Sequence, residues 1–323
     1  MNFAILRDRA FAGEPLSRWE CRGVLKCPRE QLEELSQYVY EVRYRYKGNR
    51  VSVQILTNAK SGNCDQNCAY CAQSAVSRAK IEKYPLVPFG ILKNTASVAL
   101  KKGINCHCIG LSGMHFTDEQ IDAFCEHIHR LGPQTPICCS IGFVTRSQAK
   151  KLKEAGITRI NHNLNTGRNF YPRICTTHTY SERIANIEML QALGFEICCG
   201  GIVGMGESDE DVIDMLLDVR QIAPECVPIN FLIPIQGTPL GTADTQKLTP
   251  EYCLKVLMLA RLLNPRADVR CAAGRELYLK NHHAAMFQSV SSIFAAGYLT
   301  ASGDGIEKTI KLIQECGFEY VSR

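Results

Sequence analysis

The sequence predicts an α/β protein, a single (β/α)8 barrel of the TIM type with an N-terminal helical extension. From residue 51 onward, a short apolar run, a polar turn and a helix-period stretch follow one another eight times. No linker or change of composition interrupts this alternation, so residues 51–323 form one predicted barrel and residues 1–50 a helical cap. A doubly wound open sheet is the competing architecture. It typically carries a Gly-rich phosphate turn after its first strand, and here that position holds a cysteine-rich loop.

The eight apolar runs are rich in Ile, Val and Cys, which is typical of parallel strands buried on both faces. They span residues 51–56, 104–111, 136–144, 157–164, 195–203, 227–233, 268–273 and 292–296.

The intervening helices carry recognisable N-terminal signals. Thr249-Pro250 places proline at the first position of one helix. Three others begin with a capping box, at Thr117-x-x-Gln120, Thr145-x-x-Gln148 and Thr179-x-x-Glu182.

Composition excludes several classes of protein. No apolar run approaches the length that spans a membrane, and charges within residues 1–9 interrupt a signal-peptide core. We therefore expect a cytoplasmic protein, in which the 17 cysteines stay reduced and serve metal ligation or packing. The net charge is +5 without a basic run interleaved with aromatics, so nucleic-acid binding is not indicated.

Three cysteines follow the first predicted strand with the spacing Cys-x-x-x-Cys-x-x-Cys, at Cys64, Cys68 and Cys71. Three thiolates can hold three irons of a 4Fe–4S cluster and leave the fourth iron open. A structural zinc site would need a fourth ligand nearby, and the next histidine is the distant His107. The spacing, with Tyr70 before the last cysteine, resembles the signature of the radical S-adenosylmethionine (SAM) enzymes. That resemblance implies that SAM binds the open iron.

Two further segments point to ligand binding. Residues 200–207 read Gly-x-Ile-x-Gly-x-x-Glu, which resembles a radical SAM motif whose isoleucine, here Ile202, packs on the adenine. A glycine hinge between strand and helix is the structural alternative. Asn161, Asn163 and Asn165 alternate along one predicted strand and would face the barrel interior, where amides need hydrogen-bonding partners.

With the segments at residues 161–166, 176–183, 227–230, 237–240 and 269–276, the chain resembles the biotin synthase family from about residue 50 to 300. The resemblance implies that Asn163 and Asn230 bind the ureido ring of dethiobiotin, with Thr300 near its valeryl tail. It places Tyr70, Asn163 and Ile202 at the cofactor and Arg183 at the SAM carboxylate. Two positions depart from the family pattern. Asn165 replaces an aspartate expected near the SAM ribose, and His178 replaces an arginine.

The family also holds an auxiliary iron–sulfur cluster, usually 2Fe–2S, that donates sulfur. The matching positions are Cys108, Cys138, Cys198 and Arg270, each on a predicted strand. Period-two alternation turns the neighbouring Cys139, Cys199 and Cys271 toward the helices, and it puts Cys106 on the same inward face as Cys108. Cys106 stands where the family usually has arginine. Four inward thiols favour a four-iron form in which Cys106 replaces Arg270 as ligand, and a simple core role for Cys106 is the alternative.

The remaining cysteines have no partner spacing and are expected to pack in the core, at Cys21, Cys27, Cys125, Cys175, Cys226, Cys253 and Cys316.

The resemblance implies a radical SAM sulfurtransferase that inserts sulfur into dethiobiotin, with no catalytic residues beyond the cluster ligands. It also implies an electron donor of the flavodoxin or ferredoxin type and a homodimer. The alternatives are another enzyme of this class, of the hydrogenase-maturation or methylornithine synthase type, and a non-catalytic iron–sulfur carrier. A carrier would hold its clusters near the surface and would not need the amide pair Asn163 and Asn230.

Overall fold

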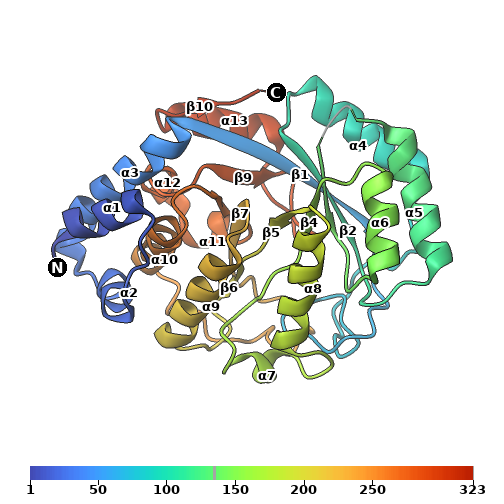
Figure 1. The fold of residues 1–323 in the computed structure, drawn as a ribbon, viewed down its shortest axis with the longest axis horizontal. Coiled ribbons are helices and arrows are strands. Elements are labelled where there is room, and N and C mark those ends of the chain that lie inside the picture. The colour runs from blue at the N-terminus through green and yellow to red at the C-terminus, as the bar shows by residue number, and fades with distance from the viewer. Residues whose placement is uncertain (134–135, 323) are drawn as a thin grey trace.

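The computed structural model describes residues 1–133 and 136–322, and its centre is a closed barrel of parallel strands (Figure 1). The last strand of the barrel pairs with the first, since Ser52 lies opposite Ser292 and Ile55 opposite Ala295. This closure confirms the (β/α)8 barrel and excludes the open sheet. The strands are β1 (Arg50–Lys60), β2 (Cys106–Leu111), β3 (Ile137–Ser140), β4 (Arg159–Asn161), β5 (Glu196–Cys198), β6 (Gly201–Val203), β7 (Cys226–Phe231), β8 (Asp268–Cys271) and β9 (Ser292–Ala295), with the short β10 (Glu319–Tyr320) beside the start of β1.

Helices surround the barrel and begin where their caps predict (Figure 1). The capping boxes at Thr117, Thr145 and Thr179 are formed, and Thr249 caps a helix with proline at its first position. The outer helices are α4 (Phe89–Lys101), α5 (Asp118–Leu131), α6 (Arg146–Glu154), α8 (Tyr180–Ala192), α9 (Asp209–Ile222), α10 (Pro250–Leu263) and α13 (Ile306–Glu315). Shorter ones are α7 (Tyr171–Ile174), α11 (Arg275–Tyr278), η2 (Lys280–His282) and α12 (His283–Phe287).

The N-terminal extension is helical, as predicted, and lies against α9 and α10 on one side of the barrel (Figure 1). Its buried side chains, among them Leu35 and Val39, belong to the same hydrophobic core as the barrel strands. The extension therefore closes one flank of the barrel. It consists of α1 (Phe3–Ala12), α2 (Arg18–Leu25), η1 (Arg29–Gln31) and α3 (Leu32–Lys47).

Several strands are shorter than predicted, and in two of them local contacts explain the change. The run at 195–203 divides into β5 and β6 around Gly200, where a Cβ atom would lie 2.0 Å from the carbonyl oxygen of Pro228. The run at 157–164 ends at Asn161, and Asn165 takes a left-handed conformation with φ 73°. The Asn163 side chain accepts a hydrogen bond from the Gly200 backbone N–H at 3.0 Å, which joins the ends of the two interrupted strands.

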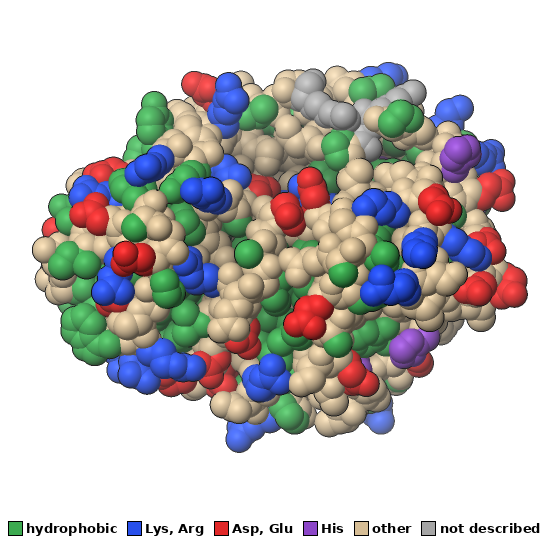
Figure 2. Space-filling view, viewed as in Figure 1, with side chains coloured by type: hydrophobic (Ala, Val, Ile, Leu, Met, Phe, Trp, Pro, Cys, Tyr) green, Lys and Arg blue, Asp and Glu red, His purple; other side chains and the backbone are tan. Residues whose placement is uncertain are grey.

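No helix within the described residues is both long and apolar enough to cross a membrane. On the face seen in Figure 2, acidic and basic side chains are interspersed.

Candidate active site

The C-terminal ends of the strands enclose a cavity of about 380 Å³, called here the upper cavity. In a (β/α)8 barrel this is the end where the βα loops carry the chemistry. Nearly all the predicted site residues line it. They are Cys64, Tyr70, Cys71, Cys108, Cys138, Asn163, Asn165, Arg183, Ile202, Asn230, Arg270 and Thr300.

The cysteine loop follows β1 and is held in shape by two amide side chains. Gln73 accepts a hydrogen bond from the Gly62 N–H at 2.9 Å, and its own backbone oxygen accepts one from Cys64 at 3.3 Å. Asn67 bonds the segment after α7, including the Thr176 hydroxyl at 2.6 Å. These contacts anchor the loop over the end of the barrel, with Cys64 and Cys71 at the wall of the upper cavity.

The three predicted cluster thiols differ in their surroundings. Cys68 is buried, and its Sγ lies 3.8 Å from the Sγ of Cys175, which also lies 3.3 Å from Nδ1 of His178. Cys68, Cys175 and His178 thus offer ligand atoms within 4.8 Å of one another. Cys175 is buried in the hydrophobic core, as predicted, and it also contacts Cys68 and His178. Its contact joins loops far apart in sequence, which no spacing signal reveals.

The donor set of the loop fits an iron–sulfur cluster with an open position. Cys64 and Cys71 are half-buried and border the empty space of the upper cavity, so a ligand has room beside a bound cluster. Burial raises the pKa of the Cys71 thiol to about 11. The metal-free thiol is then protonated near neutral pH, so that ligation must release a proton.

The glycine motif after β5 is held by its own glutamate. The buried Glu207 carboxylate accepts hydrogen bonds from the Gly204 and Met205 N–H groups, both at 2.7 Å. Gly204 has φ +104°, a conformation that favours glycine. The turn leaves Ile202 on β6 half-buried at the wall of the upper cavity, and its contact with adenine stays a prediction.

Arg183 is nearly fully buried and links several predicted residues. Its guanidinium donates to the Asn163 carbonyl oxygen at 3.0 Å and to the Tyr171 hydroxyl at 2.5 Å, and it lies 2.8 Å from Nε2 of His178. His178, which stands where the resemblance expects an arginine, therefore lies directly beside the Arg183 guanidinium. Arg183 also lines the upper cavity, and its contact with the SAM carboxylate stays a prediction.

Asn230 on β7 bridges the neighbouring strands. Its amide nitrogen donates to the Gly201 oxygen at 3.1 Å, and its amide oxygen accepts from the Ala273 N–H at 3.1 Å. A primary amide has two N–H groups and an oxygen with two lone pairs, so one donor and one acceptor position remain. The strand contacts hold the amide in a defined orientation at the cavity wall.

Deeper in the barrel lies a compact group of buried thiols, called here the thiol layer. It comprises Cys106, Cys108, Cys138, Cys198 and Cys226. Cys139, Cys199 and Cys271 belong instead to the core between strands and helices, so the predicted alternation is confirmed. Cys226, expected only to pack, in fact joins the inward group. Its position two residues before Pro228 and four before Asn230, which line the upper cavity, was the available signal.

Arg270 is the buried cation of this layer. Its Nη1 lies 3.9 Å from the Cys198 Sγ, while Nε donates to Ser292 and Nη2 pairs with Asp268 at 3.2 Å. Burial opposes its charge, but the surrounding thiolates and Asp268 raise the pKa of Arg270. The arginine therefore stays protonated and stabilises thiolates facing it.

Two protein-family models match this chain, one after the other along the sequence. Residues 59–219 match the Radical SAM superfamily and residues 228–319 the Biotin and Thiamin Synthesis associated domain. The biotin synthase of Geobacillus kaustophilus is 38% identical over 320 residues, covering 98% of this chain and 96% of the relative. That of Sulfurihydrogenibium sp. is 39% identical over 318 residues, covering 98% and 95%. A crystal structure of methylornithine synthase, 18% identical, superposes with a TM-score of 0.84 over 98% of this chain and 97% of that one.

The barrel, the loop with Cys64, Cys68 and Cys71, and the superfamily match together define a radical SAM enzyme. Sequence identity of 38% and 39% over almost the whole length of both chains shows the family within this class. The chain belongs to the biotin synthase family.

Proposed function

We propose that this chain is a sulfurtransferase that inserts sulfur into dethiobiotin to form biotin. The observation that carries the proposal is the single upper cavity, which has Cys64 and Cys71 at its rim and Cys108 and Cys138 from the thiol layer at its floor. A substrate bound between the thiols at the rim and those at the floor would lie next to both clusters. When bound, the four-iron cluster and SAM supply the one-electron chemistry that removes hydrogen atoms from substrate carbons.

The protein itself binds and orients SAM and the substrate, and it excludes water from them. On the SAM side we assign the cluster thiols Cys64, Cys68 and Cys71, with Arg183 for the carboxylate. We also assign Tyr70, Asn165 and Ile202 to contacts with SAM. Dethiobiotin is assigned to the donors and acceptors of Asn163 and Asn230, with Thr300 at its tail.

Two other readings are less well supported. Another enzyme of this class, such as a methylornithine synthase, shares the barrel, but the thiol layer suits a reaction that consumes sulfide. A non-catalytic carrier would hold clusters near the surface, whereas Cys108, Cys138 and Cys198 are buried in the barrel interior. SAM cleavage under reducing conditions separates a carrier from an enzyme.

Asn230→Ala tests the substrate assignment. We expect dethiobiotin binding to weaken by about 1–3 kcal/mol because a polar group of the ring loses its buried partner. Binding of SAM should change less. Isothermal titration of both ligands measures this, with Asn264→Ala as control because that buried amide bonds Ala260 away from the cavity. Unchanged dethiobiotin affinity would place the ring elsewhere.

The fourth ligand of the auxiliary cluster is proposed to be Cys106. Cys108, Cys138 and Cys198 supply three thiolates, and Cys106 belongs to the same buried layer. Arg270 already bonds Ser292 and Asp268, so its guanidinium is engaged by protein groups. Four thiolates suit a four-iron cluster, and three thiolates with Arg270 suit the two-iron form.

Iron and sulfide counts test the cluster size. In protein carrying Cys64→Ala, Cys68→Ala and Cys71→Ala together, only the auxiliary site remains, and the proposal expects about four irons per chain. Adding Cys106→Ala should lower the count. Two irons per chain, unaffected by Cys106→Ala, would contradict the four-iron form and favour Arg270 as ligand.

The remaining assignments follow from the reaction. A flavodoxin or ferredoxin-type protein would supply the electrons, and a reducing cytoplasm would keep the thiols free for the clusters. We also propose a homodimer, which sedimentation of the loaded protein would test.

A further inference from the structure

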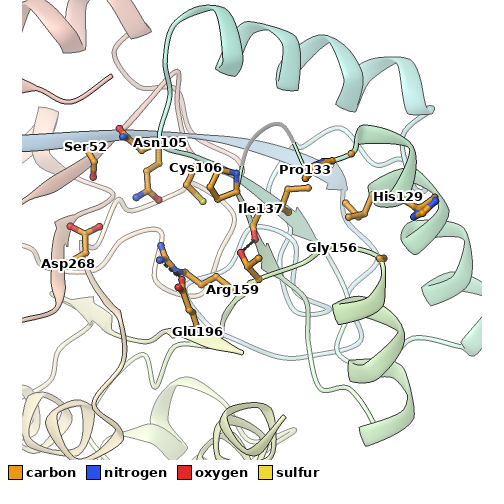
Figure 3. A pocket seen from close by; sticks show the side chains of 16 residues that line it. Ser52, Asn105, Cys106, His129, Pro133, Ile137, Gly156, Arg159, Glu196 and Asp268 are labelled. Atoms are coloured by element: carbon orange, nitrogen blue, oxygen red, sulfur yellow. Dashed lines mark hydrogen bonds and ion pairs between the residues drawn. The ribbon is translucent and has the colours of Figure 1, made fainter. Parts of the chain in front are cut away.

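A second cavity, of about 640 Å³, opens at the opposite end of the barrel and is called here the lower cavity (Figure 3). The first residues of several strands line it, among them Cys106 of β2, Arg159 of β4, Glu196 of β5 and Asp268 of β8. At its rim, Thr158 and Glu196 are exposed. Residues at this end of a (β/α)8 barrel usually contribute to stability and not to chemistry. A cavity that leads from solvent to a thiol is therefore unexpected here.

Strand alternation places the thiol layer between the two cavities. Side chains two residues apart on one strand face the same interior at successive heights. On β2, Cys106 lines the lower cavity and Cys108 the upper one. On β8, Asp268 lines the lower cavity and Arg270 the upper one. The thiol layer is therefore the partition between two spaces.

Gln54 of β1 connects the lower cavity with a predicted cluster ligand. Its side chain is 2% exposed and lines the lower cavity, and its Oε1 accepts a hydrogen bond from the Cys108 Sγ at 3.7 Å. A molecule in the lower cavity would thus lie one side chain away from Cys108 and directly against Cys106.

Two charged side chains of the lower cavity, Arg159 and Asp268, lie around the same space as Cys106 (Figure 3). Arg159 pairs with Glu196 on the neighbouring strand β5. A small sulfur anion would therefore meet a cation beside the thiol layer.

We propose that the lower cavity is the entrance through which hydrosulfide reaches the auxiliary cluster. The inference rests on the proposed function, because sulfur insertion removes sulfide from that cluster. SAM and dethiobiotin would fill the upper cavity, which leaves the opposite end of the barrel as the free approach. Entry involves no redox change, because the sulfur atoms of hydrosulfide and of cluster sulfide have the same oxidation state. Cys106, Cys108, Cys138 and Cys198 would hold the cluster that takes up this sulfur, and the S–H bond would break on uptake. The proton passes to water in the cavity.

Isotope exchange tests the entrance in the full-length protein. In the Cys64→Ala/Cys68→Ala/Cys71→Ala background, all acid-labile sulfide belongs to the auxiliary site. That protein, anaerobic and iron-loaded, is mixed with sodium sulfide enriched in sulfur-34, and mass spectrometry follows incorporation. Ser52→Phe/Thr158→Phe adds bulk from two sides of the lower cavity. Ser52→Ala/Thr158→Val, which removes the hydroxyls without filling the cavity, is the matched control.

We expect incorporation to slow several-fold in the Phe pair and to keep the parental rate in the control pair. Equal rates in both pairs, or equal slowing in both, would overturn the entrance. If the Phe pair fails to load iron, Thr158→Phe alone gives the same comparison against Thr158→Val. The proposed function is checked separately, by first-turnover biotin from these substitutions in otherwise unaltered enzyme. If the parental enzyme forms biotin but the Phe pair does not slow sulfide exchange, the entrance alone is refuted. If the parental enzyme forms no biotin, the proposed function is refuted.

Discussion

Replacing any one of Cys64, Cys68 or Cys71 with Ala is expected to abolish SAM cleavage. The open iron exists only when the other three irons are each held by a thiolate, so two cysteines cannot support the site. Anaerobic incubation with dithionite and SAM, followed by chromatography for 5′-deoxyadenosine, measures the effect. The loss should be complete within the detection limit.

Cys125→Ala provides the control for this series. Cys125 is half-buried on α5, outside both cavities, so its loss should leave the rate unchanged. A Cys64, Cys68 or Cys71 variant that forms 5′-deoxyadenosine at the parental rate would disprove the role of the cysteine loop.

Cys138→Ala is expected to stop biotin formation while SAM cleavage continues. Cys138 belongs to the thiol layer and faces the floor of the upper cavity, whereas the SAM-binding cysteines lie in the loop after β1. Loss of the auxiliary cluster removes the sulfur source without touching the first cluster. Parallel assays for 5′-deoxyadenosine and biotin separate the two effects.

Cys139→Ala is the matched control, one residue further along the same strand. Cys139 points into the core between strands and helices, so this change should keep biotin formation and the auxiliary iron. The account of the thiol layer fails if Cys138→Ala still makes biotin at the parental rate, or if Cys139→Ala loses the auxiliary iron as completely as Cys138→Ala.

Local rules made much of the fold predictable. A capping box uses neighbouring residues alone, so the helix starts at Thr117, Thr145 and Thr179 follow directly from sequence. Strand alternation likewise separated Cys138 from Cys139. The same alternation would have placed Cys226 among the inward-facing thiols. The predicted strand began at residue 227, however, whereas β7 begins at Cys226.

Contacts between distant segments were not predictable from spacing. The contact between Cys175 and Cys68 depends on how the loop after α7 packs against the loop after β1. The sequence of neither loop indicates where the other lies. The lower cavity exists only because closure of the barrel gathers the first residues of several strands. The break at Gly200 likewise reflects the close approach of the Pro228 carbonyl from a neighbouring strand.

Anaerobic turnover with dethiobiotin, SAM and a reductant tests the central claim most directly. Mass spectrometry of the products should find biotin, together with methionine and 5′-deoxyadenosine, when both clusters are loaded. SAM cleavage without biotin from fully loaded enzyme, with dethiobiotin recovered unchanged, would contradict the account and point to another substrate.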